Sequence, residues 1–199
     1  MAIQRLGGDD DPIISVVAER FCLPYAAELL VKKKVQAFSN AHYDVYDATG
    51  NILLQIDGGV WNLKRKRVMR DPAGLPVLTM REKAFTWRHQ WLIHQGEGSD
   101  SKDLLCTVQT SHALQFKRQL DVFLAGNQTK DCDFHITGSL SSLSFKVHKG
   151  NSVLAEVIHN FTWGSFCKGK DSFTMRVQPD VDYAFIVALT VIIQENDSG

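Results

Sequence analysis

Residues Val181–Gln194 (VDYAFIVALTVIIQ) decide the fold, because nearly every side chain in them is apolar. Wound as a helix at about 100° per residue, the stretch is apolar on all faces, and Thr190 is the only polar residue deep inside it. Such a helix is either buried in a core or spans a membrane. About 14 residues at ~1.5 Å each give ~21 Å, against ~30 Å of hydrocarbon in a bilayer. The length predicts a buried core helix and no transmembrane segment.

The entry to this stretch also favours a helix. Asp180, which follows Pro179, is the predicted N-cap, and Asp182 is an acid in the predicted first turn, where the helix dipole favours negative charge. A β-strand is the alternative, because Ile, Val, Tyr and Phe are strand formers and a continuous apolar run has no diagnostic period. The length of the run and the Asp-x-Asp entry favour the helix.

Most of the remaining chain alternates polar and apolar residues between turns that contain Gly, a pattern typical of antiparallel strands. Three hairpins share one form, an alternating strand, a Gly-containing bend and a second alternating strand; they are His42–Asp57, Arg67–Arg81 and Phe145–His159, with bends at 48–51, 71–74 and 149–151. Further strands are predicted at Leu29–Val35, Trp87–His94, Leu104–Thr110, Leu114–Leu124, Phe134–Gly138 and Ser172–Val177.

These elements predict a mainly β protein, a closed antiparallel barrel of about twelve strands around a buried hydrophobic C-terminal helix. Closure would surround the helix and would remove exposed strand edges. Residues 1–20, which include Gly7-Gly8 and the acidic run before Pro12, are interpreted as a flexible N-terminal tail. Residues 21–199 are interpreted as one domain, because no linker-like segment interrupts them.

Net charge, the N-terminal sequence and the cysteine spacing argue against several classes of protein. Lys+Arg 22 and Asp+Glu 22 give a formal net charge of +0, so the whole molecule is not expected to bind nucleic acid directly. The N-terminus lacks a signal-peptide pattern, and the four cysteines (Cys22, Cys106, Cys132 and Cys167) form no C-x-x-C pair. We therefore expect a reducing, cytoplasmic setting, ordinary thiols, no zinc site and no cofactor.

Catalytic signatures are not found in the sequence. There is no G-x-S-x-G, no phosphate-binding G-x-x-x-x-G-K-[ST], no G-x-G-x-x-G and no H-E-x-x-H, and the seven histidines are dispersed. Asp131 and Asp133 form a D-x-D that could bind a cation, but this signal is weak and a solvated turn is favoured. We expect a protein that is not an enzyme.

Two basic clusters are the strongest candidates for a binding site. They comprise Lys32, Lys33 and Lys34, and then Lys64, Arg65, Lys66 and Arg67 with Arg70, close to Trp61. Such clusters attract anionic lipid, and similar runs direct nuclear import or contact nucleic acid. A simply solvated face is the third interpretation, since alternate residues of a strand point in opposite directions. Whether the two clusters converge in space is left open by the sequence.

Four stretches carry a family resemblance: Tyr43–Asp47 with Gly50-Asn51, Met69–Leu78 (MRDPAGLPVL), Leu78–Arg81 leading into Trp87–Gly96 (WRHQWLIHQG), and the apolar C-terminal segment. Together they resemble the plant LURP-one-related family. The likeness extends from about residue 20 to the C-terminus. It implies a fold similar to the tubby C-terminal domain and to phospholipid scramblases, a twelve-stranded barrel around a hydrophobic C-terminal helix.

The resemblance implies less about function. Tubby domains bind phosphoinositide headgroups, scramblases move lipids, and the plant family is linked to pathogen defence. Scramblases place a calcium-binding acidic segment before the C-terminal helix, where this chain has only Asp171, Asp180 and Asp182. A set of 6–8 oxygen ligands is not in evidence there, and the helix is short for a membrane span, which argues against calcium-dependent lipid flipping.

The leading hypothesis from the sequence is a non-enzymatic intracellular binding module with a tubby-like barrel. It would attach peripherally to anionic lipid or phosphoinositide at the plasma membrane, in defence signalling. The alternative is a protein-interaction or transcription-linked adaptor that enters the nucleus. A carrier with a ligand pocket at the mouth of the barrel is a third hypothesis.

Overall fold

The structure is a computed structural model, and it describes residues 12–36, 40–58, 66–83, 90–110, 119–139, 144–159 and 172–197. Its strands are β1 (Ala27–Gln36), β2 (Asn40–Tyr46), β3 (Ile52–Gly58), β4 (Lys66–Arg70), β5 (Pro76–Glu82), β6 (Gln90–Gln95), β7 (Leu104–Thr110), β8 (Gln119–Leu124), β9 (Phe134–Ser139), β10 (Ser144–Lys149), β11 (Ser152–His159) and β12 (Ser172–Val177). Two short 3₁₀ helices, η1 (Glu19–Phe21) and η2 (Ser101–Asp103), and one α-helix, α1 (Tyr183–Asp197), complete the described elements.

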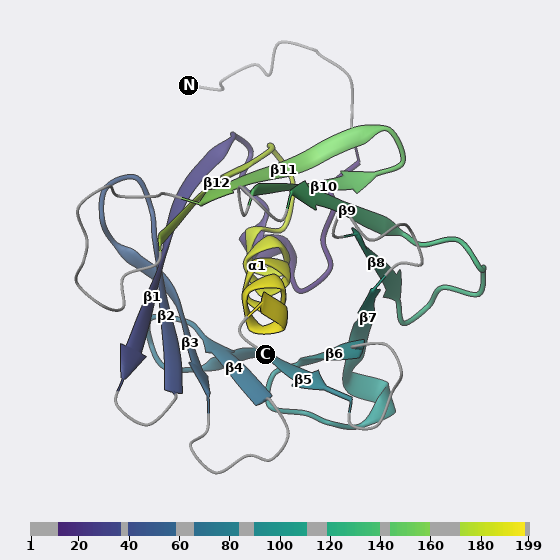
Figure 1. Ribbon diagram of the computed structural model, residues 1–199, viewed down its shortest axis with the longest axis horizontal. Helices are drawn as coiled ribbons and strands as arrows, with labels where there is room; N and C mark the ends of the chain where they lie inside the picture. Colours follow the sequence, from purple (N-terminus) through teal and green to yellow (C-terminus); the bar gives the residue numbers. More distant parts are fainter. Residues whose placement is uncertain are drawn as a thin grey trace, which may run out of the picture.

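The twelve strands form one closed antiparallel barrel, as the sequence predicts. Each strand pairs with its neighbour in the chain, and β1 pairs with β12 from Ala27↔Val177 to Lys32↔Ser172 to close the ring. Along β3, buried side chains such as Leu54 and Ile56 alternate with more exposed ones, so one face of this strand is apolar and points inward. In β5 the residues from Val77 to Met80 are all buried. Figure 1 shows α1 in the middle of this ring.

Helix α1 fills the barrel, and the predicted buried helix is confirmed. Every residue from Ala184 to Ile192 is at most 1% exposed. The hydroxyl of Thr190, the one polar group in that run, donates to the carbonyl of Ile186 at 2.9 Å, so burial leaves it satisfied. The helix begins and ends two to three residues later than the predicted 181–194. No helix in the described ranges combines the length and apolar character needed to cross a membrane.

The predicted N-cap is wrong by two residues, because Asp182 rather than Asp180 caps α1. The Oδ1 atom of Asp182 accepts the N–H of Phe185 at 3.1 Å, as an N-cap side chain does. Its Oδ2 atom accepts the N–H groups of Val16, Val17 and Ala18 at 3.2, 2.7 and 3.2 Å. Asp180 instead turns the chain, with φ of 58°.

The N-terminal segment packs across the end of the barrel where α1 begins. Ile14 forms a parallel bridge with Val181, and Cys22 forms an antiparallel bridge with Asp182. Phe21 is 5% exposed, and its ring meets that of Tyr183 edge-on at 5.4 Å. Part of residues 12–20, which the sequence assigned to a flexible tail, is therefore tied to the start of α1: Val17 is buried, whereas Ile13 is 56% exposed. Residues 1–11 lie outside the described part.

Two of the predicted hairpin bends are built in the same way. In each, an Asp at the end of one strand accepts backbone N–H groups two and four residues ahead: Asp47 accepts from Thr49 and Asn51, and Asp71 from Ala73 and Leu75. Gly50 and Gly74 adopt φ of 89° and 81° in these turns, a conformation that favours glycine. The predicted reuse of one structural unit is confirmed for these two bends.

Candidate functional site

The first predicted basic cluster lies on β1 and is split between the two faces of the wall. Lys32 and Lys34 are exposed on the outside. Lys33 is opposite Tyr43 in the register and lies on the inner side, with its Nζ 5.9 Å from the centroid of the buried Tyr43 ring. Only Lys32 and Lys34 are therefore presented to an external ligand.

The second predicted cluster lies on and before β4, and alternation splits it in the same way. Lys66 and Arg70 lie on the outer side, and Arg67 points inward with 9% of its surface exposed. Lys64 and Arg65 lie outside the described residues. Arg67 is thus a poor candidate for contact with lipid, because its guanidinium is inside the barrel.

Inside the barrel, Arg67 forms a buried ion pair with the end of α1. Its Nη2 lies 2.7 Å from Oε2 of Glu195, and the Tyr43 hydroxyl donates to Oε1 of the same carboxylate at 2.9 Å. The pairing depends on Gly58, the cross-strand partner of Arg67: a Cβ at position 58 would lie 1.5 Å from Nη1 of Arg67. These contacts give Arg67 a structural role in the barrel interior.

The outward cations of the two clusters share one face but do not touch. Across the sheet, one row of paired residues runs from Lys32 on β1 through Asp44 and Gln55 to Arg70 on β4. With strands about 4.8 Å apart, three steps separate the ends of that row by roughly 14 Å. We call the outer surface of β1–β4 that carries Lys32, Lys34, Lys66 and Arg70 the basic face.

A carboxylate network lies in the middle of the basic face. Asp44 is 1% exposed and accepts hydrogen bonds from Lys34, from His42 Nε2 at 2.8 Å, from Gln55 at 3.1 Å and from the Tyr46 hydroxyl at 3.2 Å. Burial favours a higher pKa for Asp44, but the hydrogen bonds from Lys34, Gln55 and His42 outweigh it and lower the pKa to about 2. Asp44 is therefore ionised at neutral pH.

His42 connects this network to a second carboxylate. Its Nδ1 contacts Asp57, and its Nε2 contacts Asp44. Burial lowers the pKa of His42, but the hydrogen bonds to Asp57 and Asp44 outweigh that effect and raise it above the ordinary value. The doubly protonated ring donates to both carboxylates, so the basic face gains positive charge as the pH falls.

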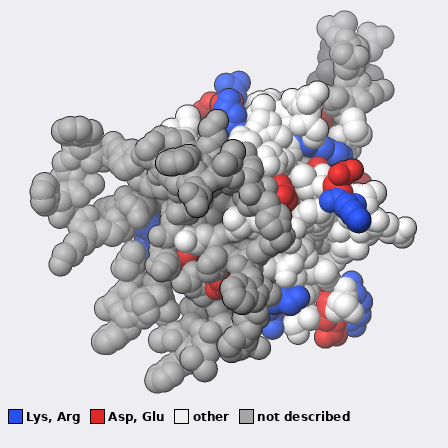
Figure 2. All heavy atoms as spheres, turned by 45° about the vertical axis from the view of Figure 1, so that its right-hand side comes forward, with Lys and Arg blue, Asp and Glu red and all other residues white. Residues whose placement is uncertain are grey.

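Two cations of the basic face have no carboxylate partner in the described part of the chain. Arg70 pairs with Glu97, and Lys34 with Asp44. Among the described residues, Lys32 and Lys66 form no ion pair, and the Lys32 Nζ lies 4.8 Å from the centroid of the Tyr46 ring. On the part of the surface turned forward in Figure 2, by contrast, Lys and Arg lie beside Asp and Glu in small mixed groups.

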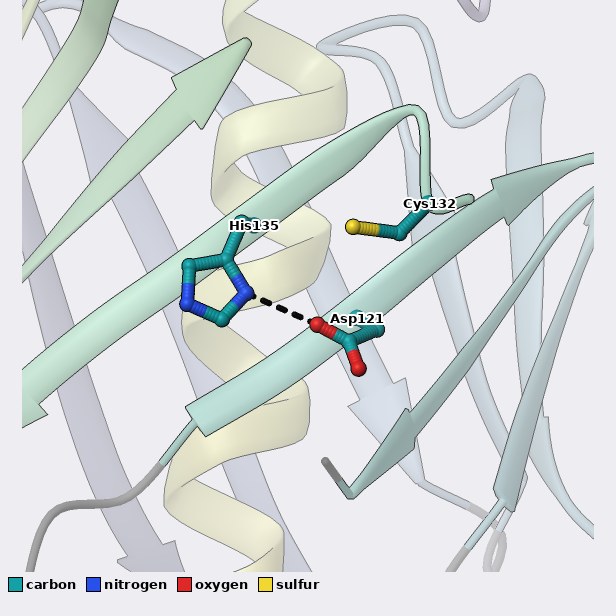
Figure 3. Close-up of side chains that lie close together, drawn as sticks. All are labelled: Asp121, Cys132 and His135. Carbon is teal, nitrogen blue, oxygen red and sulfur yellow. Dashed lines mark hydrogen bonds and ion pairs between the residues drawn. The ribbon is translucent and has the colours of Figure 1, made fainter. Parts of the chain in front are cut away.

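A second cluster, which sequence reasoning missed, lies on the outside of β8 and β9. Asp121 on β8 faces His135 on β9 in the register, and their Oδ1 and Nδ1 atoms are 2.7 Å apart. Cys132, in the segment leading into β9, brings its Sγ to the same place, so that one ligand atom of each residue lies within 4.8 Å of the others. Figure 3 shows the three side chains converging. Burial, followed by the charge of Asp121, raises the pKa of the Cys132 thiol.

The sequence held one signal for this cluster, the C-x-x-H spacing of Cys132 and His135. A prediction of zinc sites from C-x-x-C pairs alone does not include this spacing. Asp121 could not be added from the sequence, because its pairing with His135 depends on the β8–β9 register. Of the predicted D-x-D, Asp131 is exposed, while Asp133 is partly buried and accepts the N–H of Leu124 at 2.8 Å and the side-chain amide of Asn127 at 2.7 Å.

Comparison with known proteins places the chain in a family. The family model described as LURP-one-related matches residues 27–194. Protein LURP-one-related 14 of Arabidopsis thaliana is 53% identical over 94% of this chain and 93% of its own length. Protein LURP-one-related 9 of the same plant is 41% identical over 94% of this chain and 99% of its own length.

A solved structure supports the same assignment. An X-ray structure of a protein from Arabidopsis thaliana superposes with a TM-score of 0.70 at 34% identity, covering 93% of this chain and 99% of that one. This solved structure therefore has the same fold as the chain described here. With its matched region, its relatives and this structural neighbour all in agreement, the chain belongs to the LURP-one-related family.

Proposed function

We propose that this protein is a non-enzymatic binding module that associates peripherally with anionic membrane lipid, phosphoinositides included, through the basic face. The observation that carries the proposal is the outward placement of Lys32 and Lys66 without carboxylate partners among the described residues. Cations placed this way attract anionic headgroups at about 1 kcal/mol each near a membrane surface.

The paired cations of the basic face add to this attraction. The Arg70–Glu97 pair has side chains that are 33% and 53% exposed, so water and salt weaken it and a phosphate group competes for the arginine. The expected resemblance of the fold to the tubby domain, which binds phosphoinositide headgroups, points to the same ligand class. Zero net charge makes such a local surface, rather than the overall field, the determinant of binding.

Vesicle sedimentation tests the proposal. The full chain is mixed with vesicles of phosphatidylcholine alone, with added phosphatidylserine, or with added phosphatidylinositol bisphosphate at matched surface charge, over a range of salt. Binding is expected to anionic vesicles only and to weaken with salt. Arg67 is left intact, because its loss would disturb the core.

The decisive variant is Lys32→Glu combined with Lys66→Glu. Loss of two attractions of about 1 kcal/mol each predicts affinity at least about 25-fold weaker. The matched control, Lys102→Glu with Lys149→Glu, makes the same change of charge at exposed lysines away from the basic face and should leave binding within about twofold. No binding to any anionic vesicle, or equal loss in both variants, would contradict the proposal.

The same experiment separates general anionic attraction from headgroup recognition. Equal binding to the two anionic vesicles at matched charge indicates attraction alone. The adaptor alternative is distinguished in cells: a fluorescently tagged chain that stays in the nucleus, and leaves it when Lys64 and Arg65 are replaced, favours that alternative.

A further inference from the structure

We infer that Asp121, Cys132 and His135 form a binding site for a zinc-like divalent transition metal ion. The site is independent of the basic face, because it lies on β8 and β9 across the barrel from β1–β4 (Figure 1). It also departs from the expectation of no zinc site, which rested on the lack of C-x-x-C pairs.

The donor set identifies the class of ion. One thiol sulfur, one imidazole nitrogen and one carboxylate oxygen converge here. Mixed nitrogen and sulfur ligands select zinc and its neighbours in the transition series, whereas calcium and magnesium require mainly oxygen. The ligand atoms lie within 4.8 Å of one another. Tetrahedral zinc would place its ligand atoms about 3.3–3.6 Å apart, so small side-chain rotations suffice.

The orientation of the histidine argues against a cysteine–histidine–aspartate catalytic relay. In such a relay, the histidine uses one ring nitrogen for the nucleophile and the other for the carboxylate. Here Nδ1 contacts Asp121, and Figure 3 shows the sulfur of Cys132 on that same side of the ring, with Nε2 turned away. Three groups aimed at a common point suit a shared ion.

The protein holds the three ligands on supported elements. Asp121 and His135 are direct cross-strand partners in the wall of the barrel. The cysteine is fixed by its neighbour, because the Asp133 N–H donates to the Val122 carbonyl at 2.9 Å while its carboxylate is held by Leu124 and Asn127. Ligands placed by a rigid scaffold lose little freedom when an ion binds.

Three protein ligands leave a fourth position open. The three residues are each partly exposed, so water can reach the ion. The next side chain in the same row is His148, the cross-strand partner of His135, whose Nε2 lies 3.1 Å from the Thr137 hydroxyl. A site with three ligands and an open position can also take a donor from a partner molecule.

Cobalt(II) titration of the reduced, chelator-treated full chain tests the site. Cobalt is expected to bind with one equivalent and to give a sulfur-to-metal charge-transfer band together with visible bands of tetrahedral coordination. Zinc should then displace the cobalt and remove both bands. Magnesium added in place of zinc should displace none of the bound cobalt.

Variants assign the signal to these residues. Cys132→Ser should abolish the charge-transfer band, and Asp121→Asn and His135→Gln should weaken zinc binding by at least about 10–100-fold, the loss typical of supporting groups alone. Cys22→Ser, at another partly exposed thiol, is the matched control and should leave the titration unchanged. Circular dichroism of each metal-free variant confirms that it is folded.

The proposal is overturned if the wild-type chain shows no one-equivalent cobalt binding with a sulfur band. It is overturned equally if that band survives in Cys132→Ser or disappears in Cys22→Ser. Should Cys132→Ser fail to fold, the zinc affinity of His135→Gln decides, and unchanged affinity there would reject the site.

Discussion

The two ends of α1 solve the same problem, a buried carboxylate, in different ways. At the start, Asp182 is 0% exposed and is satisfied by four backbone N–H groups. At the finish, Glu195 is 5% exposed and is satisfied by the Arg67 guanidinium and the Tyr43 hydroxyl. The helix dipole favours a negative charge at the start and opposes it at the finish, so only the second carboxylate requires a cation.

The largest effect is expected at the start of the helix. Asp182→Ala removes the acceptor for four N–H groups and should cost about 4 kcal/mol or more of unfolding free energy, since an N-cap contributes about 1–2 kcal/mol and each buried unsatisfied donor costs about 1–3. Urea denaturation measures the loss. Asp180→Gly, two residues away at φ of 58°, is the control and should change stability by less than about 1 kcal/mol. If both substitutions lowered the free energy of unfolding by similar amounts, the assignment of Asp182 as the N-cap would be contradicted.

The next largest effect is expected at the finish. Arg67→Met leaves Glu195 buried without its cation and should cost about 3 kcal/mol. Adding Glu195→Gln should restore much of the loss, because the buried charge is then gone. A double-mutant cycle by urea denaturation measures the coupling between the two residues. If the losses of unfolding free energy from the two substitutions were additive, Glu195 would not depend on the Arg67 cation.

Gly58 provides a way to weaken the same ion pair indirectly. Because a Cβ at position 58 would lie 1.5 Å from Nη1 of Arg67, Gly58→Ala should displace the guanidinium and cost about 2 kcal/mol. In the Arg67→Met background the same substitution should cost much less. Thermal denaturation of the four chains checks this, and an equal cost in both backgrounds would show that the glycine serves the backbone instead.

Asp44 extends the comparison to a third carboxylate, on the outside of the wall, with the smallest effect. Its folded pKa of about 2 lies below the ordinary 3.8, so its contribution is complete above 3.8 and is lost as the pH falls through 3.8 towards 2. Asp44→Asn should cost about 1 kcal/mol near neutral pH and flatten the acid decline of stability. Asp100→Asn, at an exposed carboxylate, is the control. An unchanged acid decline in Asp44→Asn would contradict the assignment.

The fold was predictable because its signals are local. Apolar residues on all faces predicted the buried helix, and alternation with Asp and Gly at the bends predicted the hairpins. The predictions that were wrong, such as the N-cap residue, concern features that depend on contacts between residues far apart in the chain. Asp180 and Asp182 are equally good caps in sequence, and the choice is made by Val16–Ala18, far away in the chain. The same contacts hold the backbone of Val16–Ala18 against the start of α1 and bury Val17.

The candidate sites were less predictable. The basic clusters were visible, but the inward turn of Arg67 depends on which face of β4 meets the core, which no single strand reveals. Cys132 and His135 were visible as C-x-x-H, while Asp121 joins them only through the pairing of β8 with β9. A binding site assembled across strands needs the register as well as the residues.

The position of α1 after all twelve strands of the barrel has a consequence for biosynthesis. During translation the strands leave the ribosome first, and the helix that they enclose follows them. Before α1 is synthesised, the inner face of the barrel wall lacks the helix against which it packs. The barrel also cannot close before β12 is available to pair with β1. We therefore expect the nascent chain to expose the apolar inner face of its strands until α1 has been synthesised.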